Sequence, residues 1–93
     1  MTAHVIVTLN VTNPETLAEY RSKAGDAVTR HKGTPLQAST DTLVLEGDRT
    51  KPDAAVVLAF PDRDHAQNWI NDPELADIHA LRRAGSDSWI VLL

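Results

Sequence analysis

Four histidines carry the only side chains of this chain whose ordinary pKa lies near neutral pH: His4, His31, His65 and His79. No two of them are three or four residues apart on one helix, so the sequence holds no local pair of metal ligands. The last three fall near helix ends or away from an apolar stripe, and we expect them at the surface. His4 differs, because strand alternation places it on a sheet face that we expect a partner to cover.

Thr8 and Asn10 lie on the same side of that strand as His4. A buried polar side chain needs a hydrogen-bond partner, so these residues indicate either a polar pocket or hydrogen bonds at the rim of the sheet. For Asn10, which is close to the end of the strand, the rim is the preferred interpretation. All three side chains are candidate binding residues.

Four more side chains complete the candidate binding set: Tyr20, Glu46, Trp69 and Arg82. Tyr20 and Trp69, like Trp89, are expected first as core or interface aromatics and second as surfaces for a substrate. Glu46 could serve as a general base if it were buried, but a glutamate before a glycine turn is usually exposed. The pattern assigns no catalytic residue.

Composition excludes several classes of site. The chain has 93 residues and no cysteine, which rules out disulfides, thiolate metal sites and a cysteine nucleophile. Its four glycines stand alone, so it has no phosphate-binding loop, and its carboxylates form no calcium-loop pattern. We therefore expect no metal and no cofactor.

The charge and hydropathy of the chain limit the classes of partner that it can bind. Nine basic and thirteen acidic side chains give a net charge of −4, and the basic residues form no stripe suited to a nucleic-acid backbone. The N-terminus lacks the basic segment of a signal peptide, and no apolar run is long enough to span a membrane. We expect a cytoplasmic protein without nucleic-acid or membrane partners.

Among the elements that must position these residues, the most informative is a run of seven apolar residues, Ala54–Phe60, closed by Pro61. A strand with one wet face alternates apolar and polar residues, whereas this run offers apolar side chains to both faces of its sheet. The predicted helices suffice to cover one face. We expect a second copy of the chain to cover the other, which gives a homodimer with an enclosed space between two sheets.

Periodicity and capping signals indicate the remaining elements. Helices begin after Asn13, Asp62 and Asp72, and helices end at Gly33 and Gly85. The predicted strands are His4–Val11, Leu36–Glu46 with Leu43–Glu46 as its firmest part, Ala54–Phe60 and Trp89–Leu93. This order predicts a single domain, residues 1–93, with a ferredoxin-like βαββαβ fold of the α+β class: a four-stranded antiparallel sheet with helices on one face.

Together these segments resemble the family of domain of unknown function 1330, within the dimeric α+β-barrel superfamily. The resemblance covers nearly the whole chain and rests on Val11-Thr12-Asn13-Pro14-Glu15 with Tyr20, Leu45-Glu46-Gly47, Phe60-Pro61 before Ala66 and Trp69, and Pro73-Glu74 before Leu81-Arg82. It implies a homodimer whose two sheets face each other as a barrel around a pocket. The superfamily includes cofactor-independent monooxygenases, isomerases and cyclases, haem enzymes, and many members without an assigned activity.

Two functions stay open. The first is a homodimer that binds a small hydrophobic ligand, either as a binding protein or as a cofactor-independent enzyme of the monooxygenase, isomerase or cyclase type acting on a carbonyl-bearing metabolite. Polar residues on an otherwise apolar face support it. The second is a non-catalytic structural or interaction dimer without a ligand. It gains from Thr8, Asn10, Thr34 and Ala38, where the resemblance would lead one to expect acidic side chains or arginines.

Overall fold

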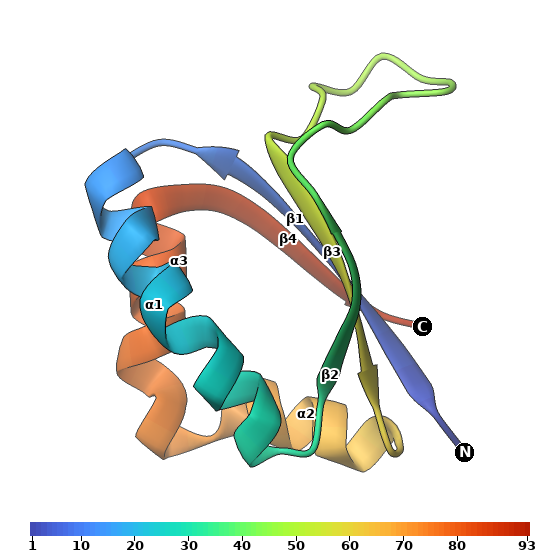
Figure 1. Ribbon diagram of the computed structural model, residues 1–93, viewed down its shortest axis with the longest axis vertical. Helices are drawn as coiled ribbons and strands as arrows, with labels where there is room; N and C mark the ends of the chain where they lie inside the picture. Colours follow the sequence, from blue (N-terminus) through green and yellow to red (C-terminus); the bar gives the residue numbers. More distant parts are fainter.

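The computed structural model describes residues 1–93 and consists of one sheet with helices on one side of it (Figure 1). The elements follow in the order β1 (Ala3–Val11), α1 (Pro14–Arg30), β2 (Thr34–Ser39), β3 (Ala54–Phe60), α2 (Arg63–Asn71), the 3-10 turn η1 (Pro73–Leu75), α3 (Ala76–Gly85) and β4 (Ser86–Leu92). The strands pair antiparallel in the order β2-β3-β1-β4. This architecture confirms the predicted ferredoxin-like α+β fold.

Strand β1 lies inside the sheet and alternates between its two faces. Its odd-numbered residues up to Leu9 are buried beneath the helices, and the even-numbered residues between them are half-buried on the other side. In the neighbouring β3, Leu58 pairs with Val5 on the helix side, and Val57 pairs with Ile6 on the other side. The apolar run of β3 therefore supplies both faces of the sheet, as its composition predicts.

The sheet face that carries no helix is called the open face here (Figure 1). The pairing registers place six apolar side chains on it: Ile6, Ala55, Val57, Ala59, Trp89 and Val91. Polar side chains share the face with them: His4, Thr8, Asn10, Thr34, Gln37, Ser39 and Asp87. Trp89 is 57% exposed there, although a core or interface position was expected for it. In a single chain the open face is partly exposed to solvent.

The three predicted caps begin the three helical segments that follow them. The side chain of Asn13 accepts a backbone hydrogen bond of 3.2 Å at the start of α1, where Pro14 occupies the first helical position. Asp62 does the same for α2 at 2.8 Å, and Asp72 for η1 at 2.9 Å. Local sequence therefore determines where each helical segment starts.

The second predicted strand is wrong in position. Strand β2 precedes most of the predicted range, and Leu43–Glu46 belongs to an exposed loop in which Leu45 is 90% accessible. Pairing between β2 and β3 ends where Ser39 faces Ala55, one residue from the start of β3. Residues 43–46 consequently have no strand to bond with, and their loop extends past the end of the sheet (Figure 1).

The core fills the layer between the sheet and the helices. Its largest fully buried side chains are Phe60 and Leu17, and the ring of Phe60 packs 5.5 Å from that of Trp69. Helices α1 and α3 approach closely at Gly85, where a Cβ atom would lie 2.6 Å from the backbone nitrogen of Leu17. Glycine is required at this position because the neighbouring atoms belong to the backbone.

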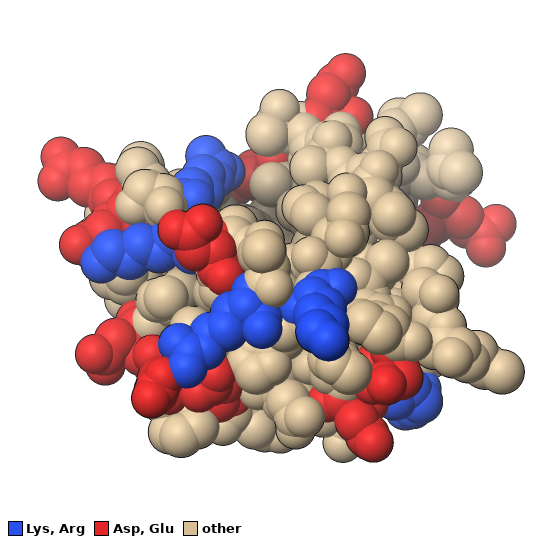
Figure 2. All heavy atoms as spheres, turned by 60° about the horizontal axis from the view of Figure 1, so that its bottom comes forward, with Lys and Arg blue, Asp and Glu red and all other residues tan.

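The surface carries charges of both signs. Figure 2 shows lysine and arginine side chains beside aspartate and glutamate side chains, without a continuous patch of one sign on the face in view. Arg30, for example, pairs with Asp72 at 3.3 Å and with Glu74. None of the helices has the length and apolar character needed to cross a bilayer.

Candidate functional site

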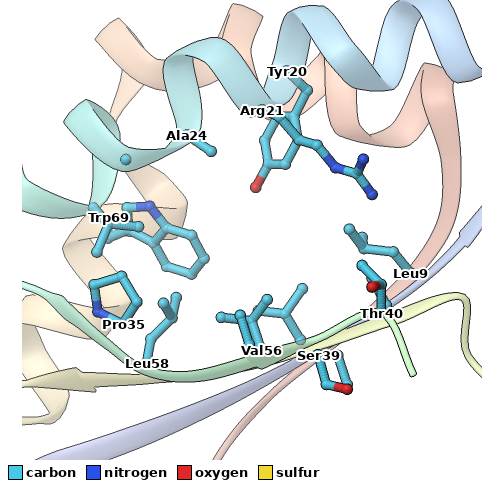
Figure 3. Close-up of a pocket in the computed structure, with 16 residues that line it drawn as sticks. Leu9, Tyr20, Arg21, Ala24, Pro35, Ser39, Thr40, Val56, Leu58 and Trp69 are labelled. Carbon is cyan, nitrogen blue, oxygen red and sulfur yellow. The ribbon is translucent and has the colours of Figure 1, made fainter. Parts of the chain in front are cut away.

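A cavity of about 410 Å³ lies between helix α1 and the helix-side face of the sheet (Figure 3). Eleven of the 16 residues that line it are hydrophobic. All of its exposed lining residues belong to α1, to the edge strand β2 or to Thr40 just after β2. The cavity therefore opens between α1 and β2, and α1 leaves this gap because it packs mainly against α3.

Strand and helix periodicities build the walls of the cavity. The floor consists of aliphatic side chains from the two inner strands: Val7, Leu9, Ala54, Val56 and Leu58. The roof is a stripe of α1 in which Tyr20, Ala24 and Val28 recur at a spacing of four residues. Gly25 widens this roof, because a Cβ atom there would meet no other atom within 4 Å.

Trp69 of α2 forms an aromatic wall at one side of the cavity (Figure 3). Its side chain is held in place by Phe60 and by His79, whose ring meets the indole edge-on at 5.2 Å. The residue is 2% exposed, which confirms the predicted core position. Its indole Nε1 is buried and has no hydrogen-bond partner, and a buried donor in that state costs about 1–3 kcal/mol.

Polar groups at the cavity are few. Tyr20 is buried, and Figure 3 shows its hydroxyl pointing into the space between the α1 roof and the floor. Arg21 and Thr40 lie across from each other at the exposed side, whereas the side chain of Ser39 points away. Arg21 is the only charged residue among the lining residues, and none of them is an aspartate, glutamate or histidine.

A buried polar pair lies behind this cavity, between α1 and α3. Arg82 donates from Nη1 to Nδ1 of His79 at 2.7 Å, and Nε2 of His79 donates to the backbone oxygen of Trp69 at 3.0 Å. The guanidinium carbon lies 5.8 Å from the ring centre of Tyr20, a cation–π contact. Burial, followed by the nearby Arg82 and Arg83, lowers the pKa of His79, which is therefore neutral at pH 7.

The surface position predicted for His79 is thus wrong, since only 3% of the residue is exposed. The buried stripe of this helical segment runs through Leu75, His79 and Arg82, spaced four and three residues apart. The prediction followed a neighbouring stripe through Ile78, which is only half-buried. The sequence signal that could have placed His79 in the core is this helical spacing, with polar residues included in the stripe.

The seven candidate binding residues do not form one site. Tyr20 and Trp69 line the cavity under α1, and Arg82 is buried behind Tyr20 without reaching the lining. His4, Thr8 and Asn10 are half-buried on the open face, as strand alternation predicts. Glu46 is exposed on the long loop.

Part of the predicted set shares a second hollow of about 600 Å³ on the open face. Thr8, Asn10 and Glu46 contribute to its lining together with Trp89 and other residues of the long loop. Its walls are mainly polar, with two hydrophobic residues among twelve. Nδ2 of Asn10 donates to the backbone oxygen of Lys51 at 2.9 Å, which supports the interpretation of Asn10 as a rim residue.

The cavity under α1 could not be read from the sequence, because it depends on the gap between α1 and β2. Sequence reasoning placed the binding space on the open face and treated Tyr20 and Trp69 mainly as core. It also passed over Arg21, whose exposed position on α1 resembles that of any surface arginine. In the folded chain no three histidine, aspartate or glutamate side chains come together as a metal site would require.

Comparison with known proteins matches residues 2–93 to the family described as domain of unknown function (DUF1330). The chain is similar to a solved protein of unknown function from Rhodopseudomonas palustris, with 20% identity and a TM-score of 0.83 over 99% of this chain and 80% of that one. It is also similar to SnoaB, a cofactor-independent oxygenase from Streptomyces nogalater, at 18% identity and a TM-score of 0.67, over 99% and 90% of the two chains.

A third similar structure is a dimeric ferredoxin-like protein of unknown function from a Jannaschia species, at 10% identity and a TM-score of 0.72, over 100% and 98% of the two chains. At these identities the likeness to solved structures concerns the fold. No curated protein sequence matches the chain.

Proposed function

The chain belongs to the DUF1330 family, and from this premise we propose that it binds a small hydrophobic, carbonyl-bearing molecule in the cavity under α1. The observation that carries the proposal is the cavity itself, about 410 Å³ in volume, mostly apolar, and open to solvent on one side. Ligand pockets typically have volumes of about 300–1,000 Å³ and combine apolar walls with a few placed polar groups.

The polar groups at this cavity suit a carbonyl oxygen. The hydroxyl of Tyr20 points into the space, and the unpartnered Nε1 of Trp69 is a second donor at its wall. A ligand oxygen that reached either donor would gain a hydrogen bond in an apolar environment. No lining residue is a carboxylate or a histidine, so the cavity offers hydrogen-bond donors without a general base.

An apolar lining with a few donors and no base supports binding first. SnoaB is a cofactor-independent oxygenase with the same fold, which keeps a cofactor-free enzyme within the proposal, but a shared fold does not transfer an activity. A catalytic role in this chain would depend on Tyr20, because its phenol is the side chain pointing into the cavity that could serve as a general acid.

The test of the proposal is to fill the cavity. Ala24→Phe should place a ring under α1 and abolish retention of a small molecule, because the Cβ of Ala24 points into the space (Figure 3). Native mass spectrometry of the freshly purified protein would show the retained mass. Ala18→Phe, on the exposed side of the same helix, is the matched control and should retain the ligand. Retention by both variants would contradict a site in this cavity.

The open face favours a second, compatible role, the formation of a homodimer. Its apolar side chains are only half-covered in one chain, and the similar protein from Jannaschia is described as dimeric. Closure of two open faces on each other would bury Ile6, Val57 and Trp89 from both copies. If Ala24→Phe and the parent protein both lacked a ligand, this association would be the function left to the chain.

A further inference from the structure

The one charged side chain that lines the cavity under α1 is positive, and so is the buried charge behind Tyr20. Arg21 lines the opening, and Arg82 lies behind the ring of Tyr20, with its guanidinium carbon 5.8 Å from the ring centre. No aspartate or glutamate lines the cavity, although the chain has thirteen acidic and nine basic side chains. An apolar space bordered in this way favours a ligand that carries a negative charge.

Arg21 is free to bind such a charge. The other two basic residues of α1 are paired: Lys23 with Glu19 at 3.8 Å, and Arg30 with Asp72 at 3.3 Å. Arg21 forms no ion pair, because the residues three and four positions away on its helix are uncharged. Figure 3 shows its guanidinium group turned over Leu9 toward Thr40, across the open side of the cavity.

The polar groups at the cavity lie at two depths. Arg21 and the hydroxyl of Thr40 lie at the solvent side, while Tyr20 and Trp69 lie deeper, at 9% and 2% exposure. An arginine fork binds a carboxylate through two parallel hydrogen bonds, and the hydroxyl can donate a third. An apolar ring system or chain would lie against the floor and the indole.

We infer that the ligand is an amphipathic organic acid, with its apolar body under α1 and its carboxylate held by Arg21 at the opening. This inference rests on the proposed function, because it names the class of molecule that the same cavity takes. The ring system is bounded by the volume of about 410 Å³, which accommodates a fused aromatic or a medium-length aliphatic body.

Two probes with the same ring system test the inference: naphthoate, which is an anion at neutral pH, and the neutral naphthylmethanol. Isothermal titration calorimetry should show that the protein binds naphthoate about ten-fold more tightly, since only the anion gains the charge-assisted hydrogen bonds. Arg21→Gln should remove this preference without changing the affinity for naphthylmethanol. Arg21→Lys should keep part of it, and rising salt should weaken naphthoate binding alone.

Lys23→Gln is the matched control, because it removes a positive charge from the same helix without altering the lining. Equal affinities for the two probes, or a preference that survives Arg21→Gln, would overturn the inference. If both probes bound equally and Ala24→Phe abolished their binding, the proposed function would stand while the inference failed. If neither probe bound the parent protein or Ala18→Phe, the proposed function would fail, and the inference would fail with it.

Discussion

At the scale of single residues, His79 shows how the fold selects one protonation state. Its Nδ1 accepts from Arg82 and its Nε2 donates to a backbone oxygen, so the neutral ring satisfies both neighbours. A second proton would convert the acceptor into a donor facing a guanidinium group. Burial is the largest cause of the lowered pKa. The hydrogen bond to the backbone oxygen of Trp69 opposes it, the charges of Arg82 and Arg83 lower the pKa further, and Asp72 opposes them.

This geometry makes the free energy of unfolding depend on pH. The pKa of His79 lies below its ordinary value of 6.5 in the folded chain, so the unfolded chain binds more protons as the pH falls below that value. The stabilising effect of the neutral ring is complete above the ordinary pKa of 6.5 and is lost progressively as the pH falls from there toward the lowered pKa of the folded chain. His79→Gln keeps one donor and one acceptor but cannot titrate, and we expect it to flatten this part of the pH profile.

Urea denaturation at a series of pH values would measure the slope for the parent protein and for His79→Gln. Two carboxyl groups, those of Asp62 and Asp72, titrate in a separate pH range and can be distinguished from His79. Their pKa values are lowered below 3.8, chiefly by side-chain hydrogen bonds with His65 and His31, so their contribution is lost only in more acidic solution. Identical slopes just below pH 6.5 in the two proteins would show that His79 is not the titrating group.

At the scale of elements, the contact between α1 and α3 depends on one glycine. The carbonyl oxygen of Gly85 accepts hydrogen bonds from the backbone nitrogens of Thr12 and Asn13, both at 3.0 Å. This contact brings the end of α3 against the start of α1.

Gly85→Ala should force the two helices apart and lower the free energy of unfolding by about 1–3 kcal/mol, as overpacking of a close contact does. Its Cβ would lie 2.6 Å from the nitrogen and 2.9 Å from the Cα of Leu17, and neither atom can rotate away. Gly25→Ala is the control, because it has open space and should gain about 1 kcal/mol of helix propensity. Equilibrium denaturation should therefore give changes of opposite sign, and losses of equal size would refute the close-contact argument.

The elements also show which features of the fold local sequence patterns can predict. Caps such as Asn13 and Asp62 act within four residues, and strand alternation repeats every two, so both were predictable. The apolar segment Leu43–Glu46 has the local character of a strand but no neighbour to pair with. Strand formation needs a partner elsewhere in the chain, and local composition does not reveal whether that partner exists.

At the scale of the whole molecule, the fold could be predicted from the sequence, because a ferredoxin-like order of elements is compatible with few other folds. The candidate site was reached only in part. The sequence offers Tyr20 and Trp69 as candidates, but the cavity that they share arises from the distance between α1 and β2, which no local pattern encodes. Arg21 gains its candidate role from that opening alone.

The open face leads to a prediction about assembly. Size-exclusion chromatography with light scattering should give twice the chain mass of 10.2 kDa for the parent protein. Val57→Lys should give the single-chain mass, because it buries a charge beside Ile6 in the proposed interface. Asn68→Lys adds the same charge at an exposed position of α2 and should remain dimeric. A parent protein that is monomeric at micromolar concentration would rule out this interface.

The strand order has a consequence for the time course of folding. Strand β1 occupies an inner position, and one of its two neighbours is β4, so that Val5 pairs with Leu92 across nearly the whole chain. During synthesis β1 therefore waits with one unpaired edge and an apolar flank until the last strand emerges. Premature release before β4 would leave that edge available for pairing with other chains. Rapid synthesis of the final residues would therefore limit aggregation of the nascent protein.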